Sequence, residues 1–412
     1  MINISLIVKR KDMKMLESKI RKIKFLLHQL QIILKLDIRV KIIYDLIEKI
    51  NREKRPIVVA PYITDWDIPL FQRPQHIARN MVEKGYTYIF FTSNTYDDID
   101  VVNEIYPNLY IVNKVYTNLF VKLINVDLKY IYTYSTDMKI NIKKLERFQK
   151  LGFQVIYDYI DEIAEELYGS SIPLSAIKKH RYCIENRNIY ICCTAKKLYE
   201  EVHQVRKTEK LSLVTNGVDY SHFATAQKKE MDKFKGKTII GYYGALSQWV
   251  DFDLITYLAK VRPEYELILI GQEYDAALKL SSIRNYSNIH VLGVIGYDEL
   301  PKYAKNFDVA IIPFKVNSIT EATSPIKLFE YMALKIPIVT TKLRECMEYK
   351  SVNVASSYEE FVRLVDEVIK FKNNAQYMKQ LKQDALKNTW ESKTQEIINL
   401  INDKVEKEDK KL

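Results

Sequence analysis

The sequence predicts an α/β protein with two successive Rossmann-like domains, a cleft between them and a helical extension before them. Short apolar runs alternate with helical segments along most of the chain, which indicates parallel sheets covered by helices on both faces. The alternation stops at a polar stretch over 214–237 and then starts again. The length of 412 residues fits two domains of roughly 100–200 residues each, with a shorter segment added.

The extension covers residues 1–54 and carries most of the basic character of the chain. Residues 1–55 hold 15 Lys and Arg against 6 Asp and Glu, a net charge of +9 out of the total of +11. Apolar side chains recur three or four residues apart and predict an amphipathic helix over 12–50, with a bend or a second helix near Asp37, where their phase shifts. Such a helix packs on the body or on a second copy, or it lies on an anionic membrane surface.

The remaining composition excludes several classes of protein. The body carries a net charge of only +2, which argues against nucleic-acid binding. A charged segment interrupts the first apolar run, so we expect no signal peptide, and no apolar run is long enough to span a membrane. These features predict a cytoplasmic protein, peripheral on the inner face of the membrane if the extension binds lipid. Four cysteines lack metal-site spacing and are typical of reduced thiols: Cys183, Cys192, Cys193 and Cys346.

The first Rossmann-like domain is predicted over 55–220. A helix is expected at 73–84 and ends at Gly85. Buried strands are expected at 57–60, 86–91, 129–134, 153–157 and 189–193.

The second Rossmann-like domain is predicted over 221–390, after a linker within 214–237. Its strands are expected at 238–242, 266–270, 289–292, 309–313 and 337–340, with helices between them. The tail over 357–405 is predicted to be helical. Its last part, 391–412, is expected to form a helix and a charged tail that packs back on the first domain.

The segment that begins at Ser324 is the most informative in the chain. Ser324 is a typical N-cap and Pro325 a typical first helical residue, so free backbone amides and the positive end of a helix dipole are expected there. Such an end binds phosphate or diphosphate. Lys327 adds a charge, and Glu330 on the same face can accept hydrogen bonds from a vicinal diol such as ribose. Together they describe a nucleoside diphosphate site; the alternative is an ordinary capped helix with a surface Lys–Glu pair.

A glycine-rich turn in the same domain favours the first interpretation. Gly241-Tyr242-Tyr243-Gly244 closes the first strand of that domain, and Gly244 lets backbone approach a ligand closely. The spacing differs from the dinucleotide-binding fingerprint. Because this turn and the segment at Ser324 follow strands of one parallel sheet, they are expected at the same edge.

These motifs resemble those of glycosyltransferases of the GT-B fold. Within that fold the chain is most similar to the bacterial group 1 type that builds cell-surface polysaccharides, such as teichuronic-acid and exopolysaccharide transferases. The resemblance covers roughly residues 55–400. It is carried by Asp65-Trp66-Asp67 with Gln72-Arg73-Pro74-Gln75-His76, Asn216-Gly217-Val218-Asp219 with Phe223, Gly241–Leu246 with Trp249, and Ser324-Pro325-Ile326-Lys327 with Glu330.

The resemblance implies that the C-terminal domain binds a nucleoside-diphosphate sugar, with UDP or GDP as the nucleotide and no further cofactor. Glu330 is then the ribose-binding carboxylate. Lys327 and the amides around Ser324 form the diphosphate clamp, and Gly244 lies on the opposite wall. The N-terminal domain takes the acceptor, a saccharide or a lipid-linked molecule.

Acceptor activation is harder to assign. An inverting enzyme needs a base within reach of the acceptor hydroxyl, and a capping role is the alternative for each candidate. Arg73 is expected to contact a phosphate or an acidic sugar, or else to be a solvent-exposed residue at a helix start. Many retaining relatives carry a Glu eight residues before Glu330, where this chain has Ala322, so the stereochemistry stays open. The candidate bases are Asp65, Asp67, His76, Asp158 and Asp161.

The expected mechanism is electrostatic. The helix end and Lys327 stabilise the departing nucleoside diphosphate while the anomeric carbon becomes oxocarbenium-like. No metal-ligand cluster is apparent in the donor half of the sequence, so we expect activity without a divalent cation. Two other functions stay open on the same fold: a sugar-nucleotide epimerase, and a sugar-nucleotide-binding protein without turnover.

Overall fold

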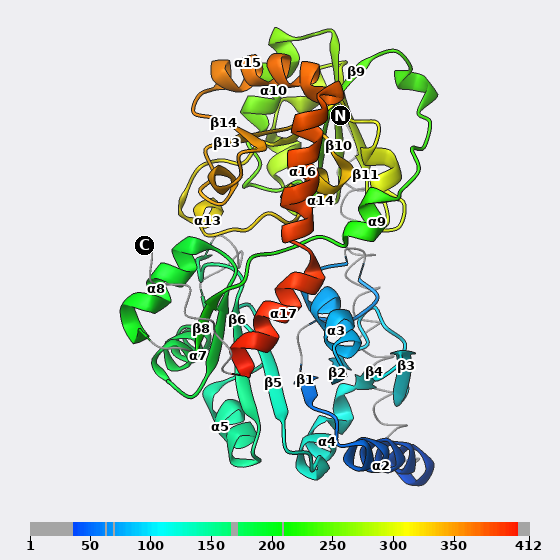
Figure 1. Ribbon diagram of the computed structural model, residues 1–412, viewed down its shortest axis with the longest axis vertical. Coiled ribbons are helices and arrows are strands. Elements are labelled where there is room, and N and C mark those ends of the chain that lie inside the picture. The colour runs from blue at the N-terminus through cyan, green and yellow to red at the C-terminus, as the bar shows by residue number, and fades with distance from the viewer. Residues whose placement is uncertain (1–35, 62–63, 69–70, 166–171, 208–209, 403–412) are drawn as a thin grey trace, which may run out of the picture. The chain divides into compact units, whose positions relative to one another are not determined.

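The computed structural model describes residues 36–61, 64–68, 71–165, 172–207 and 210–402 (Figure 1). These residues form two compact units. Unit 1 consists of 36–68, 81–133 and 137–155, and unit 2 of 71–80, 134–136 and 156–402, apart from the gaps just given. Within the described part of the chain, no helix is both long and apolar enough to cross a membrane. Of the amphipathic helix predicted over 12–50, residues 12–35 lie outside the described residues.

The first sheet contains the strands expected for a parallel α/β domain. Its strand order is β3-β4-β2-β1-β5 in unit 1 and β6-β7-β8 in unit 2. β1 pairs in parallel with β2 and β5, β2 with β4, and β7 with β6 and β8, whereas β3 is antiparallel to β4. The strands are β1 (Ile57–Ala60), β2 (Thr87–Thr92), β3 (Val102–Tyr106), β4 (Leu109–Asn113), β5 (Lys129–Tyr134), β6 (Gln154–Tyr159), β7 (Tyr190–Cys193) and β8 (Leu211–Leu213).

Three of these strands were not predicted from the sequence: β3, β4 and β8. β3 and β4 form an antiparallel hairpin joined by Pro107 and Asn108, and β3 is largely exposed, so it lacks the apolar run of a buried strand. β8 has only three residues, too few to show a period. All predicted strands of this sheet do occur, within two residues of the expected bounds.

The second sheet lies in unit 2 and is parallel throughout, with strand order β11-β10-β9-β12-β13-β14. The chain enters at the central strand β9, moves outward to β11, and then returns to the other side of β9 with β12. Such doubly wound sheets bind ligands at the carboxyl ends of the strands where the order reverses, here between β9 and β12. The strands are β9 (Thr238–Tyr243), β10 (Tyr265–Ile270), β11 (Ile289–Gly293), β12 (Val309–Ile312), β13 (Ile338–Thr341) and β14 (Val352–Ala355).

Helices cover both sheets. In unit 2, α10 packs beside α15, and α14 beside α16 (Figure 1). The longer helices are α2 (Leu36–Glu53), α3 (Arg73–Glu83), α4 (Thr117–Leu123), α5 (Ile142–Lys150), α7 (Leu174–Glu185), α8 (Lys196–Arg206), α10 (Phe252–Val261), α14 (Ile326–Leu334), α15 (Tyr358–Val368), α16 (Ala375–Lys387) and α17 (Trp390–Ile401). Four short helices are α9 (Tyr220–Ala224), α11 (Ala277–Leu280), α12 (Leu300–Ala304) and α13 (Ser318–Glu321).

Helix α2 is the described part of the basic extension. Ile43, Ile47 and Ile50 of its predicted apolar series are buried, as their spacing on one helix face requires. On its other side, Ile38 is 76% exposed and Ile42 is 40% exposed. The helix therefore packs on the body through one face and presents isolated apolar side chains on another.

The linker around Val218, which precedes the second sheet, is joined by backbone hydrogen bonds to the junction between α16 and α17. The N–H of Val218 donates to the carbonyl of Asn388 at 2.9 Å, and the N–H of Trp390 donates to the carbonyl of Val218 at 3.1 Å. Gly217 is required here, because a Cβ would lie 2.9 Å from the carbonyl oxygen of Asn388. Beyond the junction, α17 contacts β7 and β8.

Candidate functional site

The strand order of the second sheet reverses between β9 and β12. The turn after β9 lies at this position and contacts the turn after β10. Gly244 has a φ of 135° and Gly271 a φ of 150°, in the region that favours glycine. A Cβ on Gly271 would lie 1.8 Å from the carbonyl oxygen of Gly244, and a Cβ on Gly244 would lie 2.8 Å from Cε of Lys327. The missing side chains let the two turns and Lys327 come together at the carboxyl end of β9.

Helix α14 begins with no side chain capping its first amides. Pro325 is the N-cap, so the prediction that Ser324 caps the helix is wrong. The Ser324 hydroxyl instead accepts a hydrogen bond from the backbone N–H of Asn216 at 3.2 Å, and the Ser324 carbonyl accepts one from Nδ2 of Asn216 at 2.7 Å. Because the first N–H groups of a helix lack an intrahelical acceptor, this end suits an anion.

Lys327 and Glu330 lie in the first turns of α14 and have few polar partners. Nζ of Lys327 lies over the rings of Phe314 and Tyr242, 4.7 Å and 5.4 Å from their centroids. Burial lowers the pKa of Lys327 to about 8, although Glu330 raises it in part. Glu330 is 6% exposed, and burial raises its pKa to about 7, although Tyr243 and Lys327 lower it in part. Neither forms an ion pair with any described residue.

Tyr297 brings an aromatic ring close to Glu330. The ring stacks on His222, with centroids 4.5 Å apart and planes 12° apart, and lies 5.4 Å from the ring of Phe71. Its hydroxyl is buried and has no hydrogen-bond partner among the described residues. Burial and the charge of Glu330 raise the pKa of Tyr297. Tyr297 and Phe314 were not predicted from the sequence, because a single aromatic residue gives no spacing signal.

The arrangement around α14 can bind a molecule that carries both an anionic group and hydroxyl groups. Lys327 and the first amides of the helix are positive and lie by the Gly244 turn, where backbone approach is close. Glu330 is an acceptor whose ionisation is opposed by burial, so hydroxyl donors from a ligand would stabilise its charged form. The structure therefore brings together the predicted residues Gly244, Lys327 and Glu330, with Ser324 and Pro325 at the helix start.

Arg73 is buried at the start of α3 and occupied by protein groups. It is 3% exposed, and its guanidinium binds both carboxylate oxygens of Asp158, at 2.7 Å from Nε and 3.1 Å from Nη2. Nη1 donates to the carbonyl of Thr215 at 3.1 Å and to Oδ1 of Asn216 at 3.3 Å. The structure thus supports neither the predicted phosphate contact nor the solvent-exposed alternative, because the fork of N–H groups is directed at Asp158 and the linker.

In unit 1, carboxylates join the acidic turn after β1 to the loop after β2. Asp65 is 4% exposed and accepts hydrogen bonds from backbone N–H groups in 93–96. Asp97 accepts hydrogen bonds from the N–H groups of Trp66 at 2.8 Å and Asp67 at 2.7 Å. The structure does not support Asp65 as a base, because its carboxylate orders the turn. Asp67 is exposed, and burial with the charges of Asp97 and Asp65 raises its pKa, so it stays a candidate.

His76 lies inside an aromatic stack. It is 2% exposed, and its ring stacks on Trp390 with centroids 4.7 Å apart and planes 11° apart. Burial lowers its pKa to about 3, although Asp219 raises it in part. The structure does not support His76 as the base, because a ring packed in this way cannot reach an acceptor hydroxyl.

Asp158 and Asp161 lie at the carboxyl end of β6 and differ in their engagement. Asp158 is paired with Arg73. The carboxylate of Asp161 has no partner among the described residues, and burial together with the charge of Asp158 raises its pKa to about 7. A carboxyl group that exchanges its proton near neutral pH suits general base catalysis.

The position eight residues before Glu330 offers no carboxylate. Ala322 is fully buried as the C-cap of α13. Glu321 is the last residue of that helix and is half-buried. Glu321 is therefore the neighbour of the position that carries a Glu in many retaining relatives, and that position itself is the buried Ala322.

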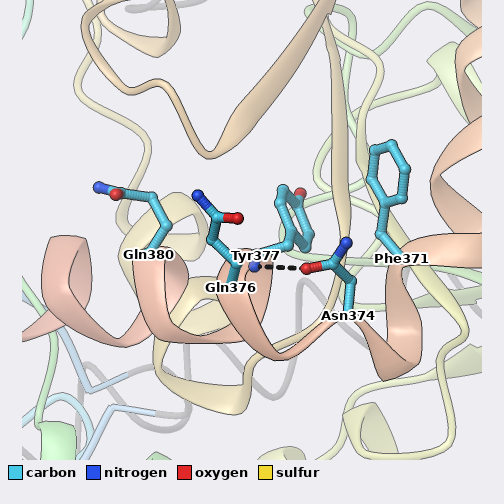
Figure 2. Close-up of a pocket in the computed structure, with 5 residues that line it drawn as sticks. All are labelled: Phe371, Asn374, Gln376, Tyr377 and Gln380. Atoms are coloured by element: carbon cyan, nitrogen blue, oxygen red, sulfur yellow. Dashed lines mark hydrogen bonds between the residues drawn. The ribbon is translucent and has the colours of Figure 1, made fainter.

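Figure 2 shows a pocket of about 270 Å³ elsewhere in unit 2, where α16 begins. It is lined by Phe371, Asn374, Gln376, Tyr377 and Gln380. The Tyr377 hydroxyl donates to the carbonyl of Ser351 at 2.7 Å and accepts from the N–H of Ile338 at 3.4 Å. Ile338 begins β13 and Ser351 precedes β14, so this pocket lies at the amino ends of the strands. Doubly wound sheets bind ligands at the opposite edge, which separates this pocket from the candidate site.

Comparison with known proteins relates part of the second half of the chain to one family. Residues 237–370, which include Gly244, Lys327 and Glu330, match the family described as glycosyl transferases group 1. A relative from Bacillus subtilis (strain 168) bears the name of a teichuronic acid biosynthesis glycosyltransferase, TuaH. It is 29% identical over 201 residues, which cover 46% of this chain and 51% of the relative. The chain thus spans about half the length of this curated relative.

Solved structures share the fold at low sequence identity. Sucrose-phosphate synthase from Thermosynechococcus elongatus has a TM-score of 0.65 and 13% identity, covering 84% of this chain and 98% of that one. WaaG, a glycosyltransferase involved in lipopolysaccharide biosynthesis, has a TM-score of 0.59 and 14% identity, covering 84% and 99%. Anabaena Alr3699/HepE, solved in complex with UDP and glucose, has a TM-score of 0.61 and 13% identity, covering 84% and 99%.

The chain has the GT-B fold, with two parallel sheets and an additional helix at the N-terminal side. It carries a group 1 glycosyltransferase domain over residues 237–370 and is homologous to a protein named for teichuronic acid biosynthesis.

Proposed function

We propose that the protein transfers a sugar from a nucleoside-diphosphate sugar to a hydroxyl of a saccharide or lipid-linked acceptor in cell-surface polysaccharide biosynthesis. The observation that carries the proposal is the pair of Lys327 and Glu330 in the first turns of α14, whose start is uncapped. Glu330 is buried and Lys327 is half-buried, and neither has an ion-pair partner among the described residues. A nucleoside diphosphate supplies anionic oxygens to Lys327 and the helix amides, and ribose hydroxyls to Glu330. The name of the Bacillus subtilis relative supports the assignment to cell-surface polymers.

UDP is the first nucleotide to test, with GDP as the alternative. HepE was solved with UDP and glucose, which supports UDP on a shared fold. The charge of Glu330 acts on the hydroxyl of Tyr297, which is buried without a hydrogen-bond partner among the described residues and could bind a hydroxyl of the ribose. No further cofactor is part of the proposal.

The chemistry that these residues supply is charge stabilisation. As the bond from the anomeric carbon to the diphosphate breaks, negative charge grows on the leaving oxygen. Lys327 and the amide end of α14 stabilise that charge better in a buried site than in water. The acceptor hydroxyl then attacks the anomeric carbon and loses its proton.

If the reaction inverts the anomeric centre, an enzyme carboxylate takes that proton. We propose Asp161 for this role, ahead of Asp67. Asp161 is half-buried, has a pKa raised to about 7, and its carboxylate has no partner among the described residues. It also belongs to unit 2, the same compact unit as Lys327 and Glu330.

A thermal-shift series tests the donor site. Wild type and Glu330→Gln are heated with UDP, GDP, ADP and CDP, each with and without chelator, and Glu321→Gln serves as a neighbouring carboxylate control. A nucleotide at about one hundred times its dissociation constant adds about 2.7 kcal/mol to the free energy of unfolding. We expect UDP to stabilise wild type and Glu321→Gln, and to lose most of its effect in Glu330→Gln.

The same series separates the alternatives. A nucleotide that stabilises the protein equally in wild type and Glu330→Gln would place the site elsewhere and contradict the proposal. Binding of UDP-sugar without release of UDP in the presence of acceptor would favour the binding protein, and conversion of one UDP-sugar into another would favour the epimerase.

We further propose that the basic extension holds the protein on an anionic membrane surface from the cytoplasmic side. The exposed Ile38 and Ile42 of α2 support this, together with the net charge of +9 over residues 1–55. Co-sedimentation of the full chain with vesicles that contain phosphatidylglycerol should exceed that with phosphatidylcholine vesicles and fall with salt. Equal recovery with both vesicles at low salt would contradict the proposal.

A further inference from the structure

An exposed pair of aromatic rings lies on the loops after β9 and β10. Trp249 belongs to the loop that contains Gly244, and Tyr274 to the loop that follows Gly271. Their ring centroids are 6.1 Å apart, with planes at 46°. Tyr274 is 68% exposed and Trp249 is half-buried. Trp249 packs in part against the core, whereas Tyr274 is not among the residues that do. A large exposed ring held beside Trp249 on a loop surface therefore calls for an explanation other than core packing.

The backbone holds these rings in place. The N–H of Leu246 donates to the carbonyl of Gln272 at 2.8 Å, and the N–H of Tyr274 donates to the carbonyl of Leu246 at 3.2 Å. On the other side, the N–H of Lys315 donates to the carbonyl of Trp249 at 2.9 Å. Three loops are thus paired by backbone hydrogen bonds, so the two rings form a platform that exists before any ligand arrives.

The platform adjoins the positive end of the candidate donor site. Val250, next to Trp249, forms a backbone bridge with Phe314. The ring of Phe314 lies 4.7 Å beneath Nζ of Lys327. Phe314 therefore links Lys327 to the loop that carries Trp249. If phosphates bind at Lys327, the rest of the same molecule can extend along these connected loops toward Trp249 and Tyr274.

We propose that Trp249 and Tyr274 bind a pyranose ring by stacking against its C–H face. This proposal rests on the proposed function, since it places a sugar beside a diphosphate clamp. Aromatic rings with one exposed face offer a rigid apolar surface, while the hydroxyls of the sugar stay in water. The sugar comes either from the nucleotide donor or from the acceptor saccharide, and both present the same ring chemistry.

Tryptophan fluorescence tests the platform directly. The chain has three tryptophans, and Trp66 and Trp390 are only 8% and 2% exposed, so acrylamide quenching reports on Trp249. Quenching is measured with UDP alone, with UDP-glucose, UDP-galactose, UDP-N-acetylglucosamine and UDP-glucuronic acid, and with the disaccharides cellobiose and N-acetyllactosamine. We expect at least one sugar-containing ligand to protect Trp249 more than UDP does. Protection by a UDP-sugar alone assigns the donor sugar, and protection by a disaccharide assigns the acceptor.

Variants separate this proposal from the proposed function. Tyr274→Ala should weaken the protective ligand about two- to tenfold, while stabilisation by UDP stays unchanged. Leu280→Ala is the matched control, because Leu280 is an exposed apolar residue (85%) shortly after Tyr274, and it should change neither. If UDP stabilises the protein but no sugar protects Trp249, the platform proposal is overturned and the donor site stands. If UDP fails to stabilise the protein, the donor site falls, and protection by a disaccharide still decides the platform.

Discussion

Unit 2 contains two pairs of opposite charge that differ in how well they are satisfied. Arg73 and Asp158 are buried and form a bidentate pair at 2.7 Å and 3.1 Å, and the guanidinium also binds the linker at Thr215. Glu330 is likewise buried and Lys327 is half-buried, and neither forms an ion pair with any described residue. The first pair has the geometry that makes a buried ion pair tolerable, and the second lacks it.

The difference distinguishes a structural pair from the pair that we propose to bind the donor. The charges of Arg73 and Asp158 are matched inside the protein, so nothing is left for a ligand. Burial moves the pKa values of Lys327 and Glu330 toward neutrality, to about 8 and about 7. Ionisable groups whose pKa values are shifted toward neutrality by burial are typical of functional sites. A ligand of complementary charge or with hydrogen-bond donors would offset the free-energy cost of that burial.

The largest expected effect comes from breaking the structural pair. Arg73→Met leaves Asp158 buried without its partner and should lower the free energy of unfolding by about 3–5 kcal/mol. Urea denaturation measures this. Arg73→Met combined with Asp158→Leu should recover most of the loss, because no uncompensated charge remains. A single variant that unfolds at the wild-type urea concentration would contradict the structural role.

The binding pair should respond in the opposite way. Lys327→Met removes a cation whose burial lowers its pKa, so stability should stay within about 1 kcal/mol of wild type or rise. Affinity for UDP should fall about 10- to 100-fold, which corresponds to one charge-assisted hydrogen bond. Urea denaturation and calorimetric titration on one sample give both values. Strong destabilisation without loss of UDP binding would assign Lys327 to the structure instead.

A substitution at Gly244 tests the position of Lys327 through the backbone of the neighbouring turn. Gly244→Ala places a Cβ 2.8 Å from Cε of Lys327 at a φ of 135°. We expect a loss of about 1–3 kcal/mol in unfolding free energy, and weaker UDP binding because Lys327 is displaced. Gly236→Ala is the control, since Gly236 also has a positive φ but no atom near its Cβ position. It should reduce stability without affecting UDP.

The pH dependence of donor binding should reflect both groups. Ionised Glu330 accepts ribose hydroxyls, so affinity should rise as pH increases through about 7, where Glu330 loses its proton. Protonated Lys327 binds the diphosphate, so affinity should fall as pH increases through about 8. Titration with UDP-glucose, whose diphosphate does not ionise in this range, should give a maximum between these values. Glu330→Gln should remove the rising limb only, and a flat profile for wild type would argue against both roles.

The smallest expected effect is that of chelation. The proposed clamp uses Lys327 and helix amides, so UDP binding and sugar transfer should be unchanged by EDTA. Initial rates with and without chelator measure this. A loss of rate that added magnesium or manganese restores would show that a metal ion takes part, and the clamp would then be incomplete.

The sequence predicted the architecture well because apolar runs are local signals. Every predicted strand occurs, and only β3, β4, β8 and β14 were missed. β3 is largely exposed, and β8 and β14 are short, so their patterns are weak, whereas β4 is fully buried and follows β3 directly in a hairpin. The fold class follows because alternation of strands and helices over 57–355 admits few topologies. Gly244, Lys327 and Glu330 could be proposed from the sequence because a glycine turn and the start of a helix leave a mark at fixed positions, and the structure brings the three residues together.

What only the tertiary structure decided is which polar residues are occupied. Asp65, His76 and Arg73 resemble a site in sequence, yet backbone amides, the Trp390 ring and Asp158 engage them. Their partners lie up to 314 residues away in the chain (His76 to Trp390), and no local pattern encodes such pairings. The sequence by itself determined the two-sheet fold and the start of α14, because both rest on short-range periodicity and backbone preference. That Glu330 is buried, Lys327 half-buried and neither ion-paired within the described residues is a property of packing, and packing exists only in the folded chain.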